Sequence, residues 1–507
     1  MRKPTYDLPV LVTVLGAALA IGAVFLLGGA SAAETAQSAM RFVTGHFGWL
    51  FLLTGLASVA FAAWLVLGPH SGLRLGPPGE PPEFSTLSWI AMMFTAGIGA
   101  SLVAWGFAEP IFYLRTPPFG VEPGTAQAVV WAHVYPLFHW GVVPWAMYTI
   151  PAVPVAYRLF VANDPRLRVG ATCESALPPA VRPGATRAID VLIALGIVGG
   201  SATSLGVGVP LVSALIARLT GVPDVLWLKA LVLFAWAVLF GTSCYRGLKG
   251  GIRVLADINM VLAIAMIGFV LIAGPTVFIL SMTTNSVGVL LDHFFQMALN
   301  TDPILRSGFA QDWTIFYWAW WLAYAPMMGL FFGRISRGRK VRELVLGIIG
   351  FGTLGTCSYL AVAGGYSLHL YETGVLPLVD MLSAEGMNPM VASIIDTLPL
   401  APLPLVAFTV LSVIFYATCL DSSAYVLASI CARGMTPDRE PPRALRVIWS
   451  ATLALMAGGI LTAGGLETVK TGTILSALPL IPVVVLMCVA LVKQLGMHGQ
   501  PIPQARR

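Results

Sequence analysis

Residues 313–326, WTIFYWAWWLAYAP, lie in an apolar run at about 312–334, long enough to cross a bilayer as a helix of about 20 residues. Phe316, Trp320 and Tyr324 recur every four residues, so they form one stripe of that helix, with Trp321 beside it. Tryptophans of membrane helices usually lie at the headgroup level or pack as core. Indole N–H donors at greater depth need partners, because hydrocarbon offers none. The stretch predicts a membrane helix with an aromatic face turned into the protein.

The composition of the whole chain is that of a membrane protein. Of its 507 residues, 57% are hydrophobic and 10% are charged, whereas soluble chains average about 25% charged residues. We expect an all-α polytopic protein, and the net charge of +6 requires no nucleic acid. The twelve expected spans lie at about 8–30, 49–68, 87–115, 126–159, 187–217, 226–245, 251–281, 312–334, 342–366, 402–431, 443–465 and 471–493.

Two further helices are expected at the membrane interface. Residues 285–300 are amphipathic but short for a span, and residues 376–397 are interrupted by Pro377 and Pro389. The first apolar run follows Arg2 and Lys3, but its length and the second run soon after it indicate a retained helix rather than a signal peptide.

The basic residues predict the orientation. If the N-terminus is cytoplasmic and the loops alternate, all but six of the 29 Lys and Arg fall on the cytoplasmic side, as the positive-inside rule requires. The six on the outer side are Arg41, Arg115, Arg218, Lys229, Arg306 and Lys470. We therefore expect a multi-pass protein of the plasma (inner) membrane with both termini in the cytoplasm.

Two other stretches bear on the site. In the third span, MFTAGIGAS (93–101) leaves the backbone thinly covered, so it can unwind and offer carbonyl oxygens, or equally pack closely against another helix. In the fourth span, HWGVVPWAMY (139–148) places Trp140, Trp145 and Tyr148 on one side of a helix, with a kink expected at Pro144.

The crowded rings suit one kind of ligand. A quaternary ammonium has no N–H to donate, so carboxylates cannot hold it by hydrogen bonds, whereas ring faces attract it by about 2 kcal/mol per desolvated contact. The sequence therefore predicts an aromatic cage for a methylated ammonium solute. The alternative for each single ring is ordinary packing.

Four motifs together resemble the betaine/carnitine/choline transporter (BCCT) family. They are AGIG with WGFAEP (96–110), HWGVVPWAMY (139–148), ATSLGVGV (202–209), and WTIFYWAWW (313–321) followed by GRISRGR (333–339). The resemblance spans the chain. It implies the fold of the amino-acid/sodium symporters (LeuT-like), with two five-helix inverted repeats, and often a homotrimer.

The resemblance also implies how the chain is divided. Residues 1–86 would hold two additional N-terminal helices and a loop, 87–281 the first inverted repeat, 282–311 a periplasmic amphipathic helix, 312–493 the second repeat, and 494–507 a short cytoplasmic tail. A tail this short argues against osmotic regulation of the kind seen in family members with long basic tails.

Carried over by position, the substrate site would lie between spans 3, 4 and 8. The box would comprise Trp140, Trp145, Tyr148, Trp320, Trp321 and Tyr324, with Phe316 on the pathway and the backbone at Gly97 and Gly99 nearby. Trp321 would be the central face. The position of Tyr324 looks like one that holds Trp in the glycine betaine carriers and Tyr in the carnitine exchangers. The residue at this position therefore does not indicate which substrate is carried.

The coupling ion is open at this point. A sodium site of the family's kind would use Thr95, Ile98, Phe415, Thr418 and Cys419, but a soft Cys419 thiol is a poor ligand for hard Na⁺. The carnitine exchangers carry an arginine in span 7 where the ion would sit, and the corresponding residue here looks like Asn259. Met328 resembles the methionine that the exchangers have near the other ion position. Another ion position would use Ser201, Thr203 or Ser204, whose hydroxyls equally bond helix carbonyls. Proton coupling would use one of the intramembrane titratable residues Glu109, His139, Asp257 and Asp421.

The resemblance implies a secondary transporter that imports glycine betaine, choline, carnitine or a related methylamine, coupled to Na⁺ or H⁺. A sodium-independent exchanger is the first alternative, and a channel or receptor with the same cage is another. An enzyme is least expected, because the six cysteines and seven histidines show no metal spacing and no nucleophile or cofactor motif is present.

Overall fold

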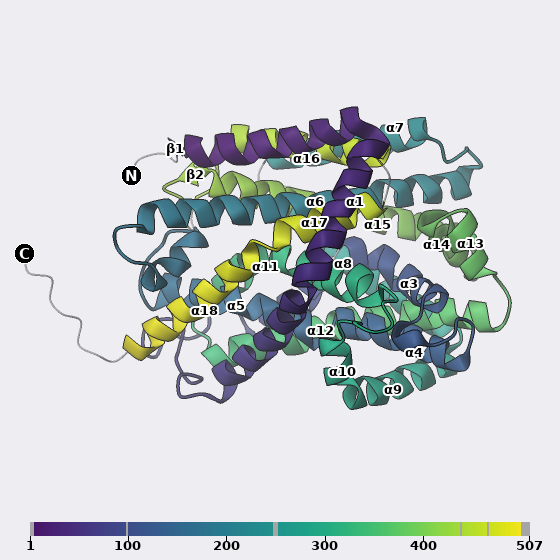
Figure 1. Cartoon of the computed structure of the whole chain (residues 1–507), viewed down its shortest axis with the longest axis horizontal. Coiled ribbons are helices and arrows are strands. Elements are labelled where there is room, and N and C mark those ends of the chain that lie inside the picture. Colours follow the sequence, from purple (N-terminus) through teal and green to yellow (C-terminus); the bar gives the residue numbers. More distant parts are fainter. Residues whose placement is uncertain (1–4, 98–99, 247–251, 437–438, 464–465, 498–507) are drawn as a thin grey trace, which may run out of the picture.

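The structure is a computed structural model that describes residues 5–97, 100–246, 252–436, 439–463 and 466–497. These residues are almost entirely helical (Figure 1). The α-helices are α1 (Leu8–Leu67), α2 (Thr86–Gly97), α3 (Ala100–Arg115), α4 (Ala126–His139), α5 (Val142–Phe160), α6 (Arg182–Thr220), α7 (Leu226–Arg246), α8 (Ile252–Ala273), α9 (Thr276–Asp292), α10 (Phe294–Leu299), α11 (Ile315–Ile335), α12 (Val341–Glu372), α13 (Leu378–Ala384), α14 (Met387–Asp396), α15 (Pro402–Ile430), α16 (Arg443–Ala463), α17 (Leu466–Ala477) and α18 (Leu480–Met497).

Short elements complete the fold. The strands β1 (Thr5–Tyr6) and β2 (Ala432–Arg433) pair antiparallel, with Thr5 opposite Arg433 and Tyr6 opposite Ala432. The 3₁₀ turns η1 (Pro118–Gly120) and η2 (Gly170–Ala176) lie in loops, and a π-helical turn, η3 (Ala310–Thr314), leads into α11.

Among the described residues, seven helices are long and apolar enough to cross a membrane, and a bent pair adds an eighth if it is one broken span. The seven are Leu8–Phe25, Ser31–Leu67, Arg182–Thr220, Ala310–Ile335, Val341–Glu372, Pro402–Ile430 and Leu480–Met497, and the pair is Ile258–Ala273 with Thr276–Asp292. The expected all-helical, multi-pass membrane protein is confirmed. The other expected spans coincide with broken or shorter helices.

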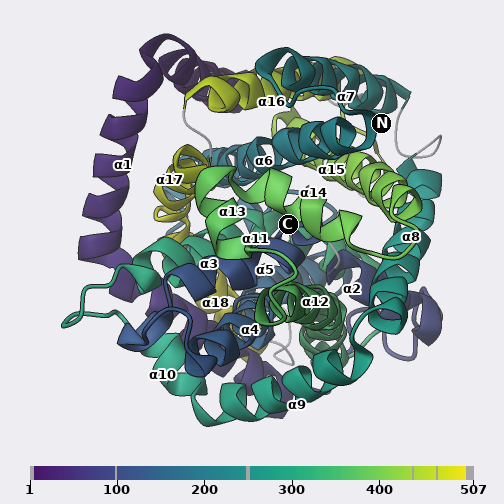
Figure 2. The ribbon, with the colours of Figure 1, turned by 90° about the vertical axis from the view of Figure 1, so that its right-hand side faces the viewer.

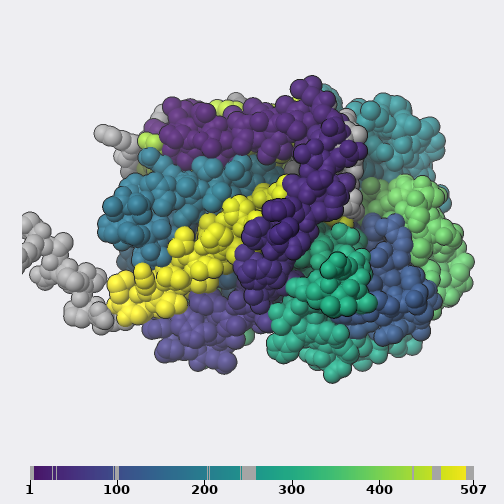
Figure 3. Space-filling model, in the orientation of Figure 1, coloured from purple at the N-terminus to yellow at the C-terminus, as the bar shows by residue number. Residues whose placement is uncertain are grey.

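The first two expected spans, 8–30 and 49–68, both lie within α1, whose two helical halves meet at a kink with no loop between them. Gly29 interrupts it with φ 48° and ψ −126°, a conformation that a residue without Cβ adopts readily. Figure 1 shows the first half of α1 beside α16 and the second half crossing the molecule, and Figure 2 shows the corner between them. In Figure 3 the second half crosses the front face beside α18.

The fourth expected span, 126–159, is broken between α4 and α5 at Trp140 and Gly141, four residues before the kink expected at Pro144. Pro144 lies in the first turn of α5, where its missing N–H has no helical partner to lose. A Cβ on Gly141 would lie 2.4 Å from the Leu137 carbonyl oxygen, so this break favours glycine.

Other expected spans are also bent or divided. The third, 87–115, is covered by α2 and α3, and residues 98–99 between them lie outside the described residues. The last, 471–493, is divided at Leu478 and Pro479 into α17 and α18. Helices α8 and α9 meet at 106°, with Gly274 and Pro275 between them. The interfacial helix expected at 285–300 therefore begins at Thr276, and Figure 2 shows it along the lower edge.

Helices α5 and α11 pack closely along their length because glycines of α11 face α5. A Cβ on Gly329 would lie 2.5 Å from Pro151, and one on Gly333 would lie 2.8 Å from Val155. Small residues allow helix backbones to approach in this way within membranes. This contact brings the two aromatic stretches of the sequence together.

Several loops rich in basic residues meet at one end of the helices. Leu75 N–H donates to Arg339 O at 2.8 Å, and Arg334 forms an ion pair of 2.8 Å with Glu83. The Arg337 guanidinium carbon lies 5.8 Å from the centre of the Phe160 ring at the end of α5. The loops after α1, α5 and α11 are thus neighbours.

Candidate functional site

Trp321 of α11 lies at the centre of an aromatic cluster contributed by α5 and by Trp140, the residue that follows α4. Its ring centroid is 5.6 Å from that of Trp140, 5.4 Å from Trp145 and 4.8 Å from Tyr148. The sequence placed these three residues on one side of an unbroken helix. They converge on Trp321 even though the helix breaks at Gly141.

Trp320 and Phe316 extend the cluster along α11. The Trp320 ring lies 5.8 Å from Trp140 and stacks on Phe316 at 5.5 Å and 24°. The expected i, i+4 stripe is therefore present in α11. Phe316 is fully buried and closes one side of Trp320.

The rings of the cluster differ slightly in burial. Trp140, Trp320 and Trp321 retain 5–7% exposure, whereas Trp318 on the same helix retains 0%. The Trp320 indole N–H has no hydrogen-bond partner among the described residues. Ring faces and one indole donor without a partner among the described residues therefore lie together in this cluster.

The break before α5 is stabilised by bonds to the freed carbonyl of Trp140. Thr356 Oγ1 of α12 donates to this oxygen at 2.6 Å, and the Trp145 indole N–H donates to it at 3.2 Å. These bonds fix the orientation of Trp145 toward Trp321. The π-helical turn η3 leads into α11, and α5 packs against both α11 and α12.

Tyr324 lies apart from the other rings, toward α6 and α15. Its hydroxyl is 3.1 Å from Ser204 Oγ and 3.8 Å from Cys419 Sγ. A Cβ on Gly200 would lie 2.9 Å from the Tyr324 ring. Tyr324 thus connects the helix of the aromatic cluster to two residues of the expected ion positions.

The expected ion positions are described in part. In α15, Thr418 Oγ1 donates to Phe415 O at 3.0 Å, so two of the expected ligands are bonded to each other. Asn259 of α8 is 1% exposed, and neither of its amide atoms has a partner among the described residues. Ile98 and Gly99 lie outside the described residues, and for Thr95, Gly97, Thr203 and Asp257 only the backbone is described.

A fully buried polar network adjoins the aromatic cluster. Glu109 of α3 accepts hydrogen bonds from Tyr113 Oη at 2.5 Å, Tyr317 Oη at 2.8 Å and the Trp140 indole N–H at 2.9 Å. His139 Nδ1 lies 2.8 Å from Tyr113 Oη. Glu109 and His139, expected as intramembrane titratable residues, therefore belong to one cluster.

Three residues of this region were missed by the sequence analysis: Tyr113, Tyr317 and Lys470. The i, i+4 spacing of Glu109 and Tyr113 on α3 was an available signal. Lys470 was expected in an outer loop, but it lies in α17 at 3% exposure, with Nζ 4.0 Å from the centre of the Trp313 ring and 5.7 Å from that of Phe316. Its methylenes and its contact with rings make burial tolerable.

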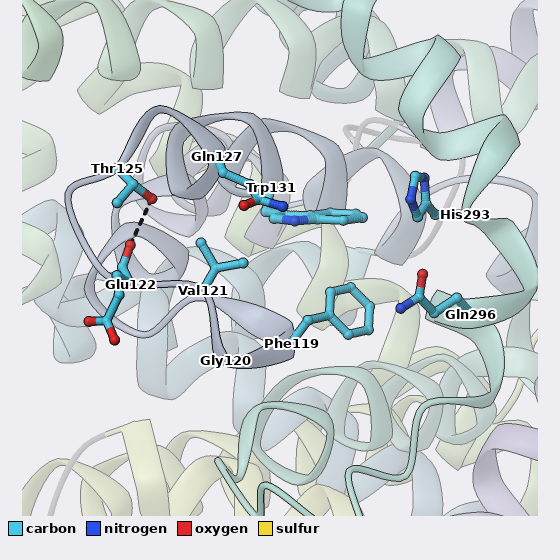
Figure 4. A pocket seen from close by; sticks show the side chains of 9 residues that line it. All are labelled: Phe119, Gly120, Val121, Glu122, Thr125, Gln127, Trp131, His293 and Gln296. Carbon is cyan, nitrogen blue, oxygen red and sulfur yellow. Dashed lines mark hydrogen bonds between the residues drawn. The ribbon is translucent and has the colours of Figure 1, made fainter.

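A solvent-open pocket of about 530 Å³ lies elsewhere, between the loop after α3 and the α9–α10 turn. Figure 4 shows Phe119 and Trp131 on one side and His293 and Gln296 on the other. It contains none of the expected site residues. Two rings here, against the four that meet at Trp321, make it the weaker site for an ammonium group.

A second polar cluster fixes the N-terminal segment. The Asp7 carboxylate pairs with Arg168 at 2.9 Å and Arg433 at 3.1 Å, and Asp7 N–H donates to Cys431 O at 2.8 Å. Burial raises the pKa of Asp7, but the bonds from Arg433 and Arg168 outweigh it and lower the pKa below its ordinary value. Asp7 therefore stays charged while it holds β1 against β2.

These features define a class: a multi-pass helical membrane protein with a buried aromatic site between helices. A family model described as BCCT, betaine/carnitine/choline family transporter, matches residues 9–500. The chain belongs to this family, and it is a transporter for substrates of the betaine, carnitine and choline kind.

Proposed function

We propose that this chain is a secondary active importer of a quaternary or methylated ammonium solute, which it carries by alternating access through the aromatic box. The observation that carries the proposal is the convergence of Trp140, Trp145 and Tyr148 on Trp321, with centroid distances of 4.8–5.6 Å. Rings at several angles around one point present faces to a spherical trimethylammonium group. Cation–π attraction holds such a group and still permits its release.

The proposed substrate also has an oxygen function. Glycine betaine and carnitine carry a carboxylate, and choline carries a hydroxyl. The Trp320 N–H lacks a partner among the described residues, so it is available to donate to that oxygen. We assign Trp140, Trp145, Tyr148, Trp320 and Trp321 to substrate binding, and Phe316 and Tyr324 to the ends of the pathway.

We extend the proposal to the architecture of the transporter. Twelve spans in a LeuT-like arrangement of two inverted repeats, a homotrimer, and an inner-membrane location with cytoplasmic termini fit the family and the distribution of basic residues. The break between α4 and α5 adjoins the aromatic cluster, as interrupted helices of transporters adjoin a central site.

We propose coupling to Na⁺ or H⁺, with ion-independent exchange as the alternative. The alternative is favoured by Cys419, whose sulfur replaces a hard oxygen ligand, and by its contact with the Tyr324 hydroxyl. Against it, Asn259 supplies no positive charge in place of an ion, and its buried amide lacks partners among the described residues. An amide oxygen is a suitable ligand for a hard cation.

The test is transport by the full-length protein in liposomes. Labelled glycine betaine, choline and carnitine are offered under an imposed Na⁺ gradient, an imposed H⁺ gradient, or with unlabelled substrate loaded inside. Concentrative uptake driven by one gradient supports the importer. Uptake that occurs only with internal substrate identifies the exchanger, and no uptake under any condition refutes both.

Cys419→Ser sharpens the choice of ion because it replaces sulfur by a hard oxygen donor. We expect the Na⁺ dependence of uptake to appear or strengthen, with a lower Na⁺ concentration at half-maximal rate. Cys488→Ser, on α18, is the matched control and should behave as wild type. An unchanged Na⁺ response in a folded Cys419→Ser protein would remove this residue from the ion site.

A further inference from the structure

The Glu109 side chain is fully enclosed, and its two carboxylate oxygens accept from three neutral donors. The only ion-pair geometry it forms among the described residues is with His139 Nδ1, at 3.4 Å. An indole N–H can only donate, so the Trp140 bond requires an acceptor oxygen at 2.9 Å. Tyr317 Oη donates to the same oxygen at 2.8 Å.

One assignment of the protons satisfies every polar atom of this network. Tyr113 has one hydroxyl proton, which it donates to Glu109 at 2.5 Å. His139 Nδ1–H then donates to Tyr113 Oη at 2.8 Å, and His139 Nε2 accepts from Thr314 Oγ1 at 3.0 Å. In this assignment every polar atom is satisfied, His139 is neutral and Glu109 is a carboxylate. With the protons placed in this way, the network carries one net negative charge.

This negative charge is joined directly to the aromatic box. Trp140 donates to Glu109 from one edge, and its ring lies 5.8 Å from Trp320 and 5.6 Å from Trp321. An indole whose N–H is bonded to an anion has a more electron-rich face, because the anion polarises the ring. Cation–π attraction is electrostatic, so it grows with that electron density.

Lys470 does not cancel this charge by direct contact. Its ammonium lies over Trp313, at 4.0 Å from the ring centre, and Trp313 in turn packs on Tyr113 at 5.0 Å. The Trp313 ring thus contacts both Lys470 and Tyr113, one of the donors to the carboxylate. Burying a carboxylate without a cationic partner lowers stability. Such a costly group inside a membrane protein usually has a function.

We infer that Glu109 is the counter-charge of the transported ammonium group: a positioning and specificity residue that acts through the Trp140 indole and makes the box prefer a cation to a neutral group of the same shape. The inference rests on the proposed function and deepens it. The negative charge of Glu109 should increase affinity most for substrates with a net positive charge, such as choline. A zwitterion gains less, because the same charge repels its carboxylate.

The experiment compares choline with 3,3-dimethylbutan-1-ol, in which carbon replaces the charged nitrogen. Dissociation constants are measured by titration calorimetry on the full-length protein in lipid nanodiscs. For Glu109→Gln we expect the Kd of choline to rise about tenfold, as for loss of a charge about 10 Å away at an effective dielectric of about 20. The Kd of the neutral alcohol should stay within about twofold of its wild-type value.

Tyr113→Phe is the control for structural damage, because it removes one hydrogen bond and leaves the carboxylate. It should change both dissociation constants by similar small factors. A parallel loss of both ligands in Glu109→Gln would mean that the residue only holds the fold, and unchanged binding of both would mean that it has no role. Either result overturns the inference.

A second pair of variants covers the case in which Glu109→Gln does not fold. Trp140→Phe and Trp145→Phe each replace one box indole, but only Trp140 donates to Glu109, whereas Trp145 donates to Trp140 O and Thr356 Oγ1. The preference for the cation is the Kd of the neutral alcohol divided by the Kd of choline. This ratio should fall further in Trp140→Phe than in Trp145→Phe. Equal falls overturn the inference. A wild type that binds neither compound, nor betaine or carnitine, refutes the aromatic box itself.

Discussion

Trp321 is the residue on which the box depends, since rings of three other residues pack against it. We predict that Trp321→Ala raises the Kd of the preferred ammonium compound by at least about 30-fold, the equivalent of about 2 kcal/mol for one desolvated cation–π face. Trp321→Phe keeps an aromatic ring that attracts a cation less strongly, so its Kd should lie between those of the wild type and Trp321→Ala. Binding is measured by calorimetry, and transport by uptake into liposomes.

The control for this substitution is a tryptophan outside the cluster. Trp64→Ala, in α1, removes an indole that is 36% exposed and should leave binding unchanged. Replacing a buried Trp by Ala costs about 3–5 kcal/mol of stability, so folding is checked by thermal unfolding. Wild-type affinity in a folded Trp321→Ala protein would place the substrate elsewhere.

At the same scale, the sequence predicted which rings belong together but not what holds them. Spacing along a helix placed Trp140, Trp145 and Tyr148 on one side, and periodicity placed Phe316 and Trp320 in a stripe. Tyr317, 208 positions from Glu109, and Trp140, 31 positions from it, both donate hydrogen bonds to its carboxylate. No local pattern reports such contacts, because they depend on how three helices pack.

At the scale of elements, α12 holds the aromatic side of α5 in place through a glycine. A Cβ on Gly352 would lie 2.4 Å from the Trp145 ring, which is closer than real Cβ contacts come. We predict that Gly352→Ala displaces Trp145 from Trp321, raises the Kd of the substrate several-fold and lowers stability by about 1–3 kcal/mol, as overpacking does. Binding and thermal unfolding measure the two effects.

Gly350 of the same helix provides a matched comparison. A Cβ there meets nothing within 4 Å, so Gly350→Ala should bind as wild type and be equally or slightly more stable. If Gly352→Ala bound the substrate as tightly as Gly350→Ala, the packing of Trp145 against α12 would not matter for the site.

The lengths of the elements were predictable only where the apolar run was unbroken. Expected spans 342–366 and 402–431 correspond to single helices, α12 and α15. The segment between the first two apolar runs was expected as a loop, yet it is helical and contains alanines, which favour helix. Gly141 broke the fourth span in place of Pro144, because a proline in the first turn of a helix is harmless.

At the scale of the whole molecule, Asp7 joins the N-terminal segment to Arg168 and to Arg433 of β2, both distant in sequence. We predict that Asp7→Asn speeds amide hydrogen exchange several-fold in peptides covering residues 5–10 and 430–435. The pKa of Asp7 is lowered in the folded protein, so its stabilising effect is full above the unfolded value of 3.8 and is lost as the pH falls through the folded value. The difference between wild type and Asp7→Asn should therefore be present at pH 7 and vanish in strong acid.

Asp292→Asn is the control for this change, because the Asp292 side chain is 80% exposed in α9 and far from the strands in sequence. It should leave exchange in both peptides unchanged. Equal exchange in wild type and Asp7→Asn at pH 7 would show that the backbone pairing of β1 and β2 alone holds the N-terminal segment.

The sidedness of the loops gives a test of the whole topology. The loops after α1, α5 and α11 contact one another and carry many basic residues, whereas the loop after α3 approaches Leu305 and Tyr371 instead. We predict that single cysteines at Pro78 and Val181, in a cysteine-free background, react with an impermeant maleimide only from the cytoplasmic side. A cysteine at Glu122 should react only from outside.

This pattern requires α2 and α3 to make a single crossing of the membrane together, because Pro78 and Glu122 lie on either side of that pair in the sequence. If each helix crossed the membrane by itself, the two cysteines would react from the same side. Val181 tests α4 and α5 in the same way. Labelling of Pro78 from outside would invert the orientation, and the basic loops would then face the wrong side of the membrane for the positive-inside rule to hold.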